Sequence, residues 1–411
     1  MFRDDIERVL RDRQQRDGYL FPAYEDYCFG NVPDTVRSVL DAGGRRALPS
    51  DVFDGVETDV DTVVLLLLVD GFGLDGWKRH RPRCGLLDRL TEAGTVTPLT
   101  SVYPSETAAA ITTLETGRLP CEHGCVGWNV YDPRLDTAFL PLGGDVKSGA
   151  AAERVPEGSV VGCESLYARM RDAGVDCHRL QPFDAGGEDV TQHVYDGLGS
   201  FGERLSAAVA ASGDPGYVYA YVPHVDHVSH AEGTDGRAYG ETVATVCEQV
   251  TAALRRVDRR TAERTLLLVT ADHGHVNTDP DANLDLSANE AVTGNLRRHA
   301  DGTPVKMSGS PRNVHLHLRP GTVPDARRAL SDHDARTFTR REAIDRDLFG
   351  DRPVSDRFRR RCGDLIVTHR DSGVWFGDVE PEKLSYVGMH GGLNPAEMLV
   401  PFAAARASAL D

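Results

Sequence analysis

The sequence predicts an α/β fold with a mainly parallel central sheet and helices on both of its faces. Two apolar runs support this prediction, TVVLLLLV at 62–69 and TLLLVT at 265–270, because neither alternates apolar with polar residues. A strand without alternation is covered on both faces, as strands of parallel sheets are. Strand-like and helix-like segments also follow one another along the chain, which indicates βαβ units.

The first half of the chain is expected to form an N-terminal arm and most of the sheet. Residues 1–52 read as a helical arm packed on the core, with an amphipathic helix over 2–16 and a second helix from about 34 that ends at a glycine. The strands that follow are expected at 62–70, 95–101, 159–163, 177–180 and 217–222. The helices between them are expected at 86–93, 107–115, 166–173 and 201–211.

The second half is expected to complete the core around an insertion. A long helix at 237–260 precedes the central strand at 265–270, and the chain closes with a strand at 398–404. Residues 279–381 read as a smaller inserted subdomain, with strands at 313–318 and 364–368 and a helical stretch at about 325–347. The predicted core therefore comprises 53–278 and 382–411.

The charge of the chain excludes some partners. A net charge of −17 argues against general nucleic-acid binding, because phosphate contacts need clustered lysine and arginine. Lysine occurs at only four positions, and every other basic residue is arginine. An acidic surface poor in lysine indicates a halophilic protein from a cytoplasm rich in salt.

Cysteine usage and hydropathy predict a soluble cytoplasmic protein that does not contact membranes. Eight cysteines in 411 residues do not form a disulfide framework and are expected to be small buried thiols. The N-terminal segment is charged and lacks the apolar core of a signal peptide. The longest dense apolar run, Val63–Val69, is too short to span a bilayer.

The stretch LTSVYPSETAAAITTLETGRLPCEHGCVGW, from Leu99 to Trp128, is the most informative part of the sequence. It predicts a strand that bends at Pro104 and a small-residue helix that begins at Thr107. A hydroxyl at a helix start lies beside unpaired backbone N–H groups and the positive end of the helix dipole. This stretch is therefore suited to hold an anion, although an ordinary N-cap would have the same pattern.

Carboxylate and imidazole side chains follow several of the predicted strands. The carboxyl ends of parallel strands meet at one edge of the sheet, where α/β proteins place their sites. An aspartate alone is often a turn former, and a histidine alone is often packed in the core. Their convergence at one edge, together with the hydroxyl at a helix start, instead indicates two divalent cations with mixed oxygen and nitrogen ligands. The six residues are Asp70, Asp226, His230, Asp272, His273 and His390.

These motifs, in the order VDGFG, PSETAAAITTLETG, DxxxH, ADHGH and GxHGG, resemble the alkaline phosphatase superfamily and specifically its type I phosphodiesterase/nucleotide pyrophosphatase family. The resemblance implies an alkaline-phosphatase-like three-layer α/β/α fold. It also implies that Thr107, nine positions before Thr116 of the Thr-Gly pair, is the nucleophile. One metal ion would be held by Asp70, Thr107, Asp272 and His273, and the other by Asp226, His230 and His390.

The chain departs from the family pattern near the nucleophile. Three alanines follow Thr107 in place of aromatic-Pro-Asn. The asparagine that helps to bind phosphate aligns with Trp128, so the neighbouring Asn129 is the candidate substrate-binding residue. Ser105 and Ser101 remain alternative nucleophiles, although neither keeps the nine-residue spacing.

The implied reaction is hydrolysis of a phosphate ester or nucleotide through a phosphothreonine intermediate at two divalent cations. Zn²⁺ is expected from the three imidazoles, with Mn²⁺ as the alternative because carboxylates contribute equally. Within the superfamily, a phosphomonoesterase, a phosphonate hydrolase or a phosphosugar mutase remains open. A sulfatase is disfavoured, because its nucleophile is a cysteine or serine that is converted to an aldehyde. From a different class, an inactive metal-stabilised binding protein is the alternative.

Overall fold

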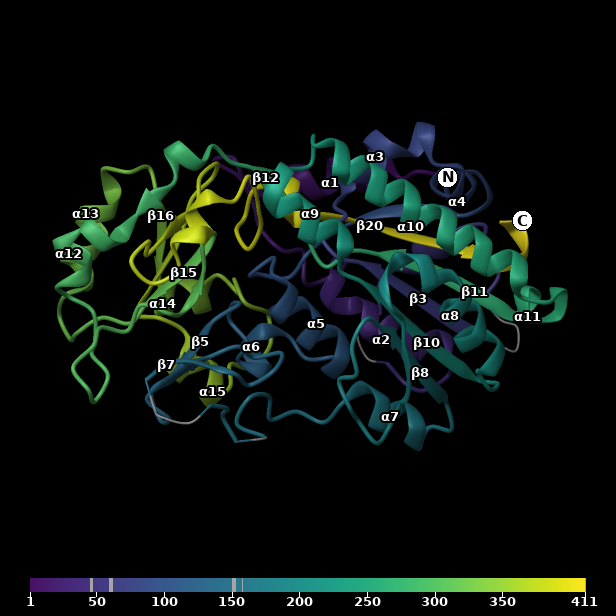
Figure 1. Ribbon diagram of the computed structural model, residues 1–411, viewed down its shortest axis with the longest axis horizontal. Coiled ribbons are helices and arrows are strands. Elements are labelled where there is room, and N and C mark those ends of the chain that lie inside the picture. Colours follow the sequence, from purple (N-terminus) through teal and green to yellow (C-terminus); the bar gives the residue numbers. More distant parts are fainter. Residues whose placement is uncertain (45–46, 59–61, 150–152, 157, 411) are drawn as a thin grey trace.

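The computed structural model describes residues 1–44, 47–58, 62–149, 153–156 and 158–410. At its centre is a seven-stranded sheet in the order β4-β20-β11-β3-β10-β8-β9 (Figure 1). Strand β20 is antiparallel to β4 and β11, and the other neighbouring pairs are parallel, so the predicted mainly parallel α/β sheet is confirmed. The strands are β3 (Val63–Val69), β4 (Thr95–Thr100), β8 (Asp176–Gln181), β9 (Thr191–Val194), β10 (Gly216–Val222), β11 (Thr265–Thr270) and β20 (Leu399–Arg406).

Helices cover the sheet in two groups. Helix α10 packs against α4, α8 and α9, whereas α5 packs against α2 and α7. Helices connect strands of the sheet along the chain. Among them are α3 (Leu74–His80), α4 (Gly85–Ala93), α5 (Thr107–Thr116), α7 (Leu166–Asp172), α8 (Gly197–Ala211), α9 (His224–Glu232) and α10 (Arg237–Arg256). In the N-terminal arm, α1 (Asp4–Gln14) contacts β4, and α2 (Val32–Val39) contacts α5.

The central strands bring the candidate site residues to one edge. Every residue of β3, β10 and β11 is buried, as the unbroken apolar sequences of β3 and β11 predict. In the register of the sheet, Val222 lies opposite Val69, and Thr270 lies opposite Leu68. The three strands therefore end side by side, and the residues that follow them start from the same place.

A second, smaller sheet lies beyond this edge, at the left of Figure 1. Its strand order is β14-β15-β17-β16, with β14 at Gly309–Ser310, β15 at Asn313–Leu316, β16 at Arg336–Thr339 and β17 at Leu365–Thr368. A separate apolar cluster surrounds it, to which Tyr131 contributes from outside the segment 279–381. Phe349, from inside that segment, belongs instead to the main core. The division of the chain at 279 and 381 remains a prediction.

Two local predictions are wrong. The stretch 325–347 is not one helix, because α13 (Val323–Ser331) and α14 (Arg340–Asp345) are separated by β16. A turn containing Asp334, at φ +53°, ends the first helix, and the β-branched residues of Arg336–Thr339 then pair with β17. Residues 159–163 form turn and irregular backbone in place of the predicted strand.

The prediction that the cysteines are buried thiols is correct for most of them but not for all. Cys84, before α4, and Cys247, on α10, form a disulfide across 163 residues of sequence. Six further cysteines are described as thiols, and all but Cys163 are buried. Over the described ranges, we find no helix that combines the length and the apolar character needed to cross a membrane.

Candidate metal centre and its pocket

The three buried strands place aspartates around one point. Asp70 follows β3 directly, and Asp272 comes two residues after β11. Helix α9 begins two residues after β10 and presents Asp226 and His230, one turn apart. His390 follows the short strand β19 (Gly388–Met389), which pairs with β12 (Val276–Asn277).

One group consists of Asp70, Thr107, Asp272 and His273. Nε2 of His273 lies 3.3 Å from Oδ1 of Asp70, 3.5 Å from Oδ2 of Asp272 and 3.1 Å from the Thr107 hydroxyl. The same hydroxyl lies 3.5 Å from Oδ1 of Asp70. All four side chains are buried. The structure therefore brings together the four residues that the resemblance assigned to the first metal ion.

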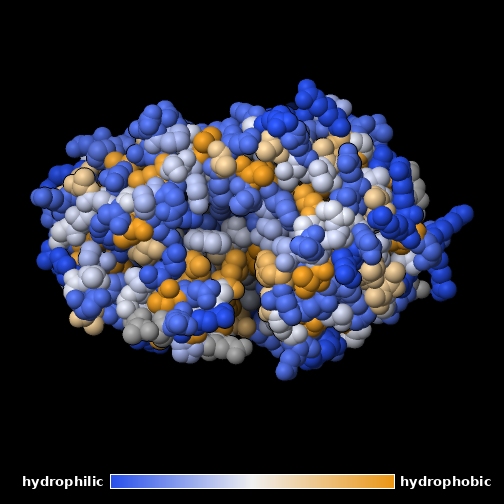
Figure 2. Space-filling model, in the orientation of Figure 1, coloured by the Kyte–Doolittle hydropathy of each residue, from blue (hydrophilic) through white to orange (hydrophobic). Residues whose placement is uncertain are grey.

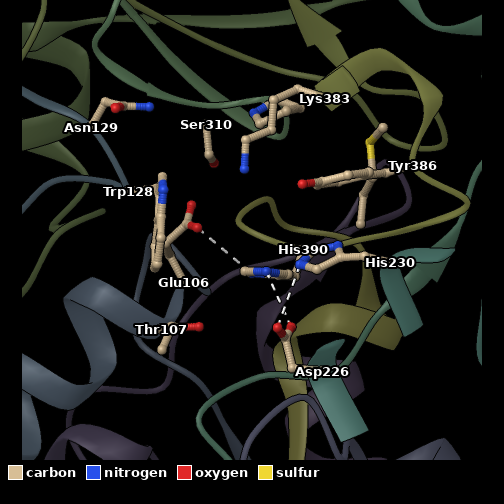
Figure 3. A pocket seen from close by; sticks show the side chains of 12 residues that line it. Glu106, Thr107, Trp128, Asn129, Asp226, His230, Ser310, Lys383, Tyr386 and His390 are labelled. Atoms are coloured by element: carbon tan, nitrogen blue, oxygen red, sulfur yellow. Dashed lines mark ion pairs between the residues drawn. The ribbon is translucent and has the colours of Figure 1, made fainter. Parts of the chain in front are cut away.

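A second group surrounds Asp226. Nε2 of His390 lies 3.4 Å from Oδ1 of this aspartate, and Nε2 of His230 lies 3.4 Å from its Oδ2 (Figure 3). His275, to which the sequence analysis gave no role, lies closer still, with Nε2 3.1 Å from Oδ1. A signal for it was present, because residues 273 and 275 of ADHGH are two apart and point the same way in extended backbone.

These distances fit divalent cations. In a tetrahedral site with metal–ligand distances of about 2.0–2.1 Å, neighbouring ligand atoms are about 3.3 Å apart. The separations in both groups, from 3.1 to 3.5 Å, lie around this value. In addition, Oδ1 of Asp226, Oδ2 of Asp272 and Nε2 of His275 are buried without a hydrogen-bond partner among the described residues. Buried polar atoms without partners are costly, and one cation in each group would satisfy them.

The imidazoles are oriented as metal ligands are. A backbone carbonyl only accepts hydrogen bonds, so a ring nitrogen facing one carries the proton. In each of the four histidines Nδ1 donates to a carbonyl, which leaves the lone pair of Nε2 directed into the centre. The pairs are His230 with Gly388 at 2.8 Å, His273 with Gly274 at 3.0 Å, His275 with Gly71 at 3.2 Å and His390 with Ser105 at 3.3 Å.

The electrostatics of the centre favour added positive charge. Burial, together with the carboxylates of Asp272 and Asp226, raises the pKa of Asp70 well above its usual value. Burial lowers the pKa of His390 well below its usual value, which keeps this ring neutral. Three carboxylates and several imidazoles in a buried space therefore suit a cation by charge as well as by shape.

Helix α5 presents Thr107 to this centre. Ala108, Ala109 and Ala110 are completely buried, so the first turn of the helix lies inside the protein. The two alternative hydroxyls are occupied elsewhere, since Ser105 donates to the carbonyl of Gly392 and Ser101 to that of Asp272. Neither serine lines the pocket beside Thr107.

Glu106, the N-cap of α5, is a pocket residue that the sequence analysis did not single out. It is 2% exposed, and its Oε1 lies 3.8 Å from Nδ1 of His390. Burial raises the pKa of Glu106 to about 7. A carboxyl group that changes charge near neutral pH therefore lies beside the proposed nucleophile.

The centre opens into a cavity of about 190 Å³. Figure 2 shows apolar residues gathered around a hollow near the middle of an otherwise mostly hydrophilic face. Trp128 and Tyr386 line the cavity, and the ammonium group of Lys383 lies 5.8 and 5.0 Å from the centres of their rings. Asn129 also lines it, held by reciprocal backbone hydrogen bonds with Gly309, but Trp128 lies between it and Glu106 in Figure 3.

A fold of this kind with two groups of acidic and imidazole ligands beside a helix-borne hydroxyl is typical of metal-dependent phosphate ester hydrolases. The family model for type I phosphodiesterase / nucleotide pyrophosphatase matches residues 64–393. The chain belongs to this family.

Solved structures confirm the fold. Murine ectonucleotide pyrophosphatase / phosphodiesterase 5 is similar with a TM-score of 0.64 and 17% identity, over 83% of this chain and 87% of that one. An inactive threonine-to-alanine variant of the murine protein in complex with AMP gives 0.65 and 17%, over 84% and 88%. The human protein gives 0.62 and 15%, over 83% and 87%. The predicted alkaline-phosphatase-like fold is thus confirmed.

Proposed function

We propose that this protein is a two-metal hydrolase of phosphate esters, of the phosphodiesterase/nucleotide pyrophosphatase type, with Thr107 as its nucleophile. The observation that carries the proposal is the arrangement of ligand atoms at tetrahedral separations in two adjoining groups, one of which includes the Thr107 hydroxyl. Membership of the family supports the reaction class. The inactive threonine-to-alanine form of the murine protein with AMP supports both the nucleophile and a nucleotide substrate.

The two ions, when bound, would neutralise phosphoryl charge and lower the pKa of the Thr107 hydroxyl. Asp70, Asp272 and His273 would hold one ion, and Asp226, His230 and His390 the other. The donor set of imidazoles and carboxylates suits Zn²⁺ best, with Mn²⁺ as the alternative.

The residues of the chain then position the reaction. Oγ1 of Thr107 would form a bond to phosphorus while the bond from phosphorus to the leaving oxygen breaks in line with it, which gives a phosphothreonine. Water attacking the same phosphorus would then break its bond to Oγ1, release the remaining phosphate monoester and return a proton to Oγ1. The free N–H groups and the dipole of α5 favour the anion at each stage. Trp128 and Tyr386 would contact the leaving group, and Asn129 remains a candidate for substrate binding.

Substitution of the nucleophile tests this proposal. Thr107→Ala should lower turnover of bis-p-nitrophenyl phosphate by about three orders of magnitude or more, because the bond-forming oxygen is lost. Thr107→Ser retains that oxygen and should keep measurable activity. Metal content, measured by elemental analysis, should remain at two ions per chain in the wild type and in Thr107→Ser.

The control is Ser105→Ala, which removes a neighbouring hydroxyl that donates to a carbonyl outside the pocket. It should retain turnover. Acid quenching during turnover and peptide mapping should place the phosphoryl label on Thr107. A label on Ser105 or Ser101, or near-normal turnover of Thr107→Ala, would contradict the assignment.

A further inference from the structure

We propose that His275 is a fourth protein ligand of the cation on the Asp226 side, and that this third imidazole makes the site prefer Zn²⁺ and Co²⁺ to Mn²⁺. The inference rests on the proposed two-metal function and adds a residue to it. The other ligands of this ion would be Asp226, His230 and His390.

One ring nitrogen of His275 is hydrogen-bonded, and the other, Nε2, has no hydrogen-bond partner among the described residues. The side chain is completely buried, and Nδ1 donates to the carbonyl of Gly71 at 3.2 Å. In the neutral ring, Nε2 is therefore an acceptor. It lies 3.1 Å from Oδ1 of Asp226, which is also an acceptor, and neither atom has a hydrogen-bond partner among the described residues.

Two buried acceptors at this separation repel each other unless a positive charge lies next to both. A proton between them would satisfy the charge, but no hydrogen bond joins these two atoms. A cation beside both atoms would satisfy the charge without one. The separation of 3.1 Å is close to the distance of about 3.3 Å between neighbouring ligands of a tetrahedral zinc ion.

The other rings approach the same point from different directions. The ring of His275 lies 5.2 Å from that of His390 and 5.5 Å from that of His230, at 75° and 79° to them. The ligand atoms of Asp226, His273, His275 and His390 all lie within 4.8 Å of one another. His275 therefore offers its ligand atom in the same group as Asp226 and His390.

The backbone at Gly71 leaves space for the imidazole ring of His275. A Cβ atom at Gly71 would lie 2.5 Å from Cε1 of His275, so a side chain at position 71 would displace the imidazole. Gly71 also has φ +72°, which favours glycine. On the other side, Val276 pairs with Met389, which holds His275 beside His390.

A third imidazole changes which metal the site prefers. Asp226, His230 and His390 alone would provide two nitrogen donors, whereas His275 makes three with one carboxylate. Imidazole suits Zn²⁺ and the neighbouring late metals, while Mn²⁺ favours oxygen donors. We therefore expect the two sites to differ, because the Asp70 side has one imidazole and three oxygen donors.

Cobalt substitution provides a test that does not depend on activity. Wild type and His275→Gln are loaded with Co²⁺ and compared by visible absorption, and Zn²⁺ and Mn²⁺ affinities are measured by competition with a chelator. The variant should show an altered cobalt spectrum for one of two ions. Its Zn²⁺ affinity at that site should fall by about tenfold or more, and its Mn²⁺ affinity should fall less.

The matched control is His315→Gln, since His315 is also buried with an unpartnered Nε2 but lies in β15 of the smaller sheet. It should leave the cobalt spectrum unchanged. Circular dichroism checks folding, and His275→Asn serves as a second variant. An unchanged cobalt spectrum with Zn²⁺ affinity within twofold of wild type would overturn the role of His275. Fewer than two ions in the wild type would instead contradict the proposed function.

Discussion

His123 is a buried histidine whose contacts differ from those of the four histidines at the candidate metal centre. Its Nδ1 accepts a hydrogen bond from the backbone N–H of Cys125 at 3.0 Å, and its Nε2 lies 3.1 Å from the hydroxyl of Thr113. Burial lowers the pKa of His123 to about 3. The neutral ring thus holds the loop after α5 in the conformation that carries Trp128 and Asn129 to the pocket.

At the residue scale, we predict that this histidine makes the fold sensitive to acid. The unfolded chain binds the proton below about pH 6.5 and the folded chain only below about pH 3, so the contribution of His123 is complete above pH 6.5 and falls with decreasing pH in between. The loss is about 1.4 kcal/mol per pH unit. In urea unfolding between pH 7 and pH 4.5, His123→Gln should lose less stability on acidification than wild type. An equal loss of unfolding free energy in wild type and variant on acidification would contradict this role of His123.

At the element scale, the loop after His390 is tied to the smaller sheet by a buried ion pair. Arg312, between β14 and β15, contacts Glu397 of α16 (Pro395–Met398) through two hydrogen bonds, at 2.7 and 3.2 Å, and both side chains are completely buried. Glu397 also accepts hydrogen bonds from the backbone N–H groups of Gly392 and Asn394. The pair therefore fixes the segment that carries His390.

Removing one partner should be costly because it leaves a buried charge uncompensated. Glu397→Gln is expected to lower the free energy of unfolding by about 3–5 kcal/mol and to weaken metal binding on the Asp226 side. Thermal melting and metal titration measure the two effects. The control is Glu263→Gln, which breaks the exposed pair with Arg259 and should change neither. Equal effects of the two variants would contradict the role given to the buried pair.

At the scale of the whole molecule, the net charge of −17 predicts that salt stabilises the fold. The Debye length grows from about 3 Å at 1 M salt to about 30 Å at 0.01 M, so surface carboxylates repel one another over much greater distances at low salt. The melting temperature should therefore be higher in molar than in millimolar potassium chloride. Identical melting curves would contradict the halophilic interpretation. A cytoplasmic location remains a prediction.

The sequence by itself determined the sheet and most of the candidate metal centre. Strands β3 and β11 were predictable because burial on both faces requires apolar residues at nearly every position, and β10 was predictable from its β-forming residues. Asp70 follows one such strand directly, and Asp272 and His273 come two and three residues after another, so their convergence follows from parallel strand order. Thr107 lies at a predicted helix start, and the family resemblance made it the candidate nucleophile through its nine-residue spacing to Thr116.

Only the tertiary structure decided which distant groups meet. The contact of His275 with Asp226, the disulfide between Cys84 and Cys247, and the approach of Lys383 to Trp128 depend on packing between segments far apart in the chain. The local sequence pattern does not predict such contacts, because hydrophobic periodicity shows which face of an element is buried and not which segment covers it. For the same reason, it predicted one helix at 325–347, where pairing with β17 makes Arg336–Thr339 a strand.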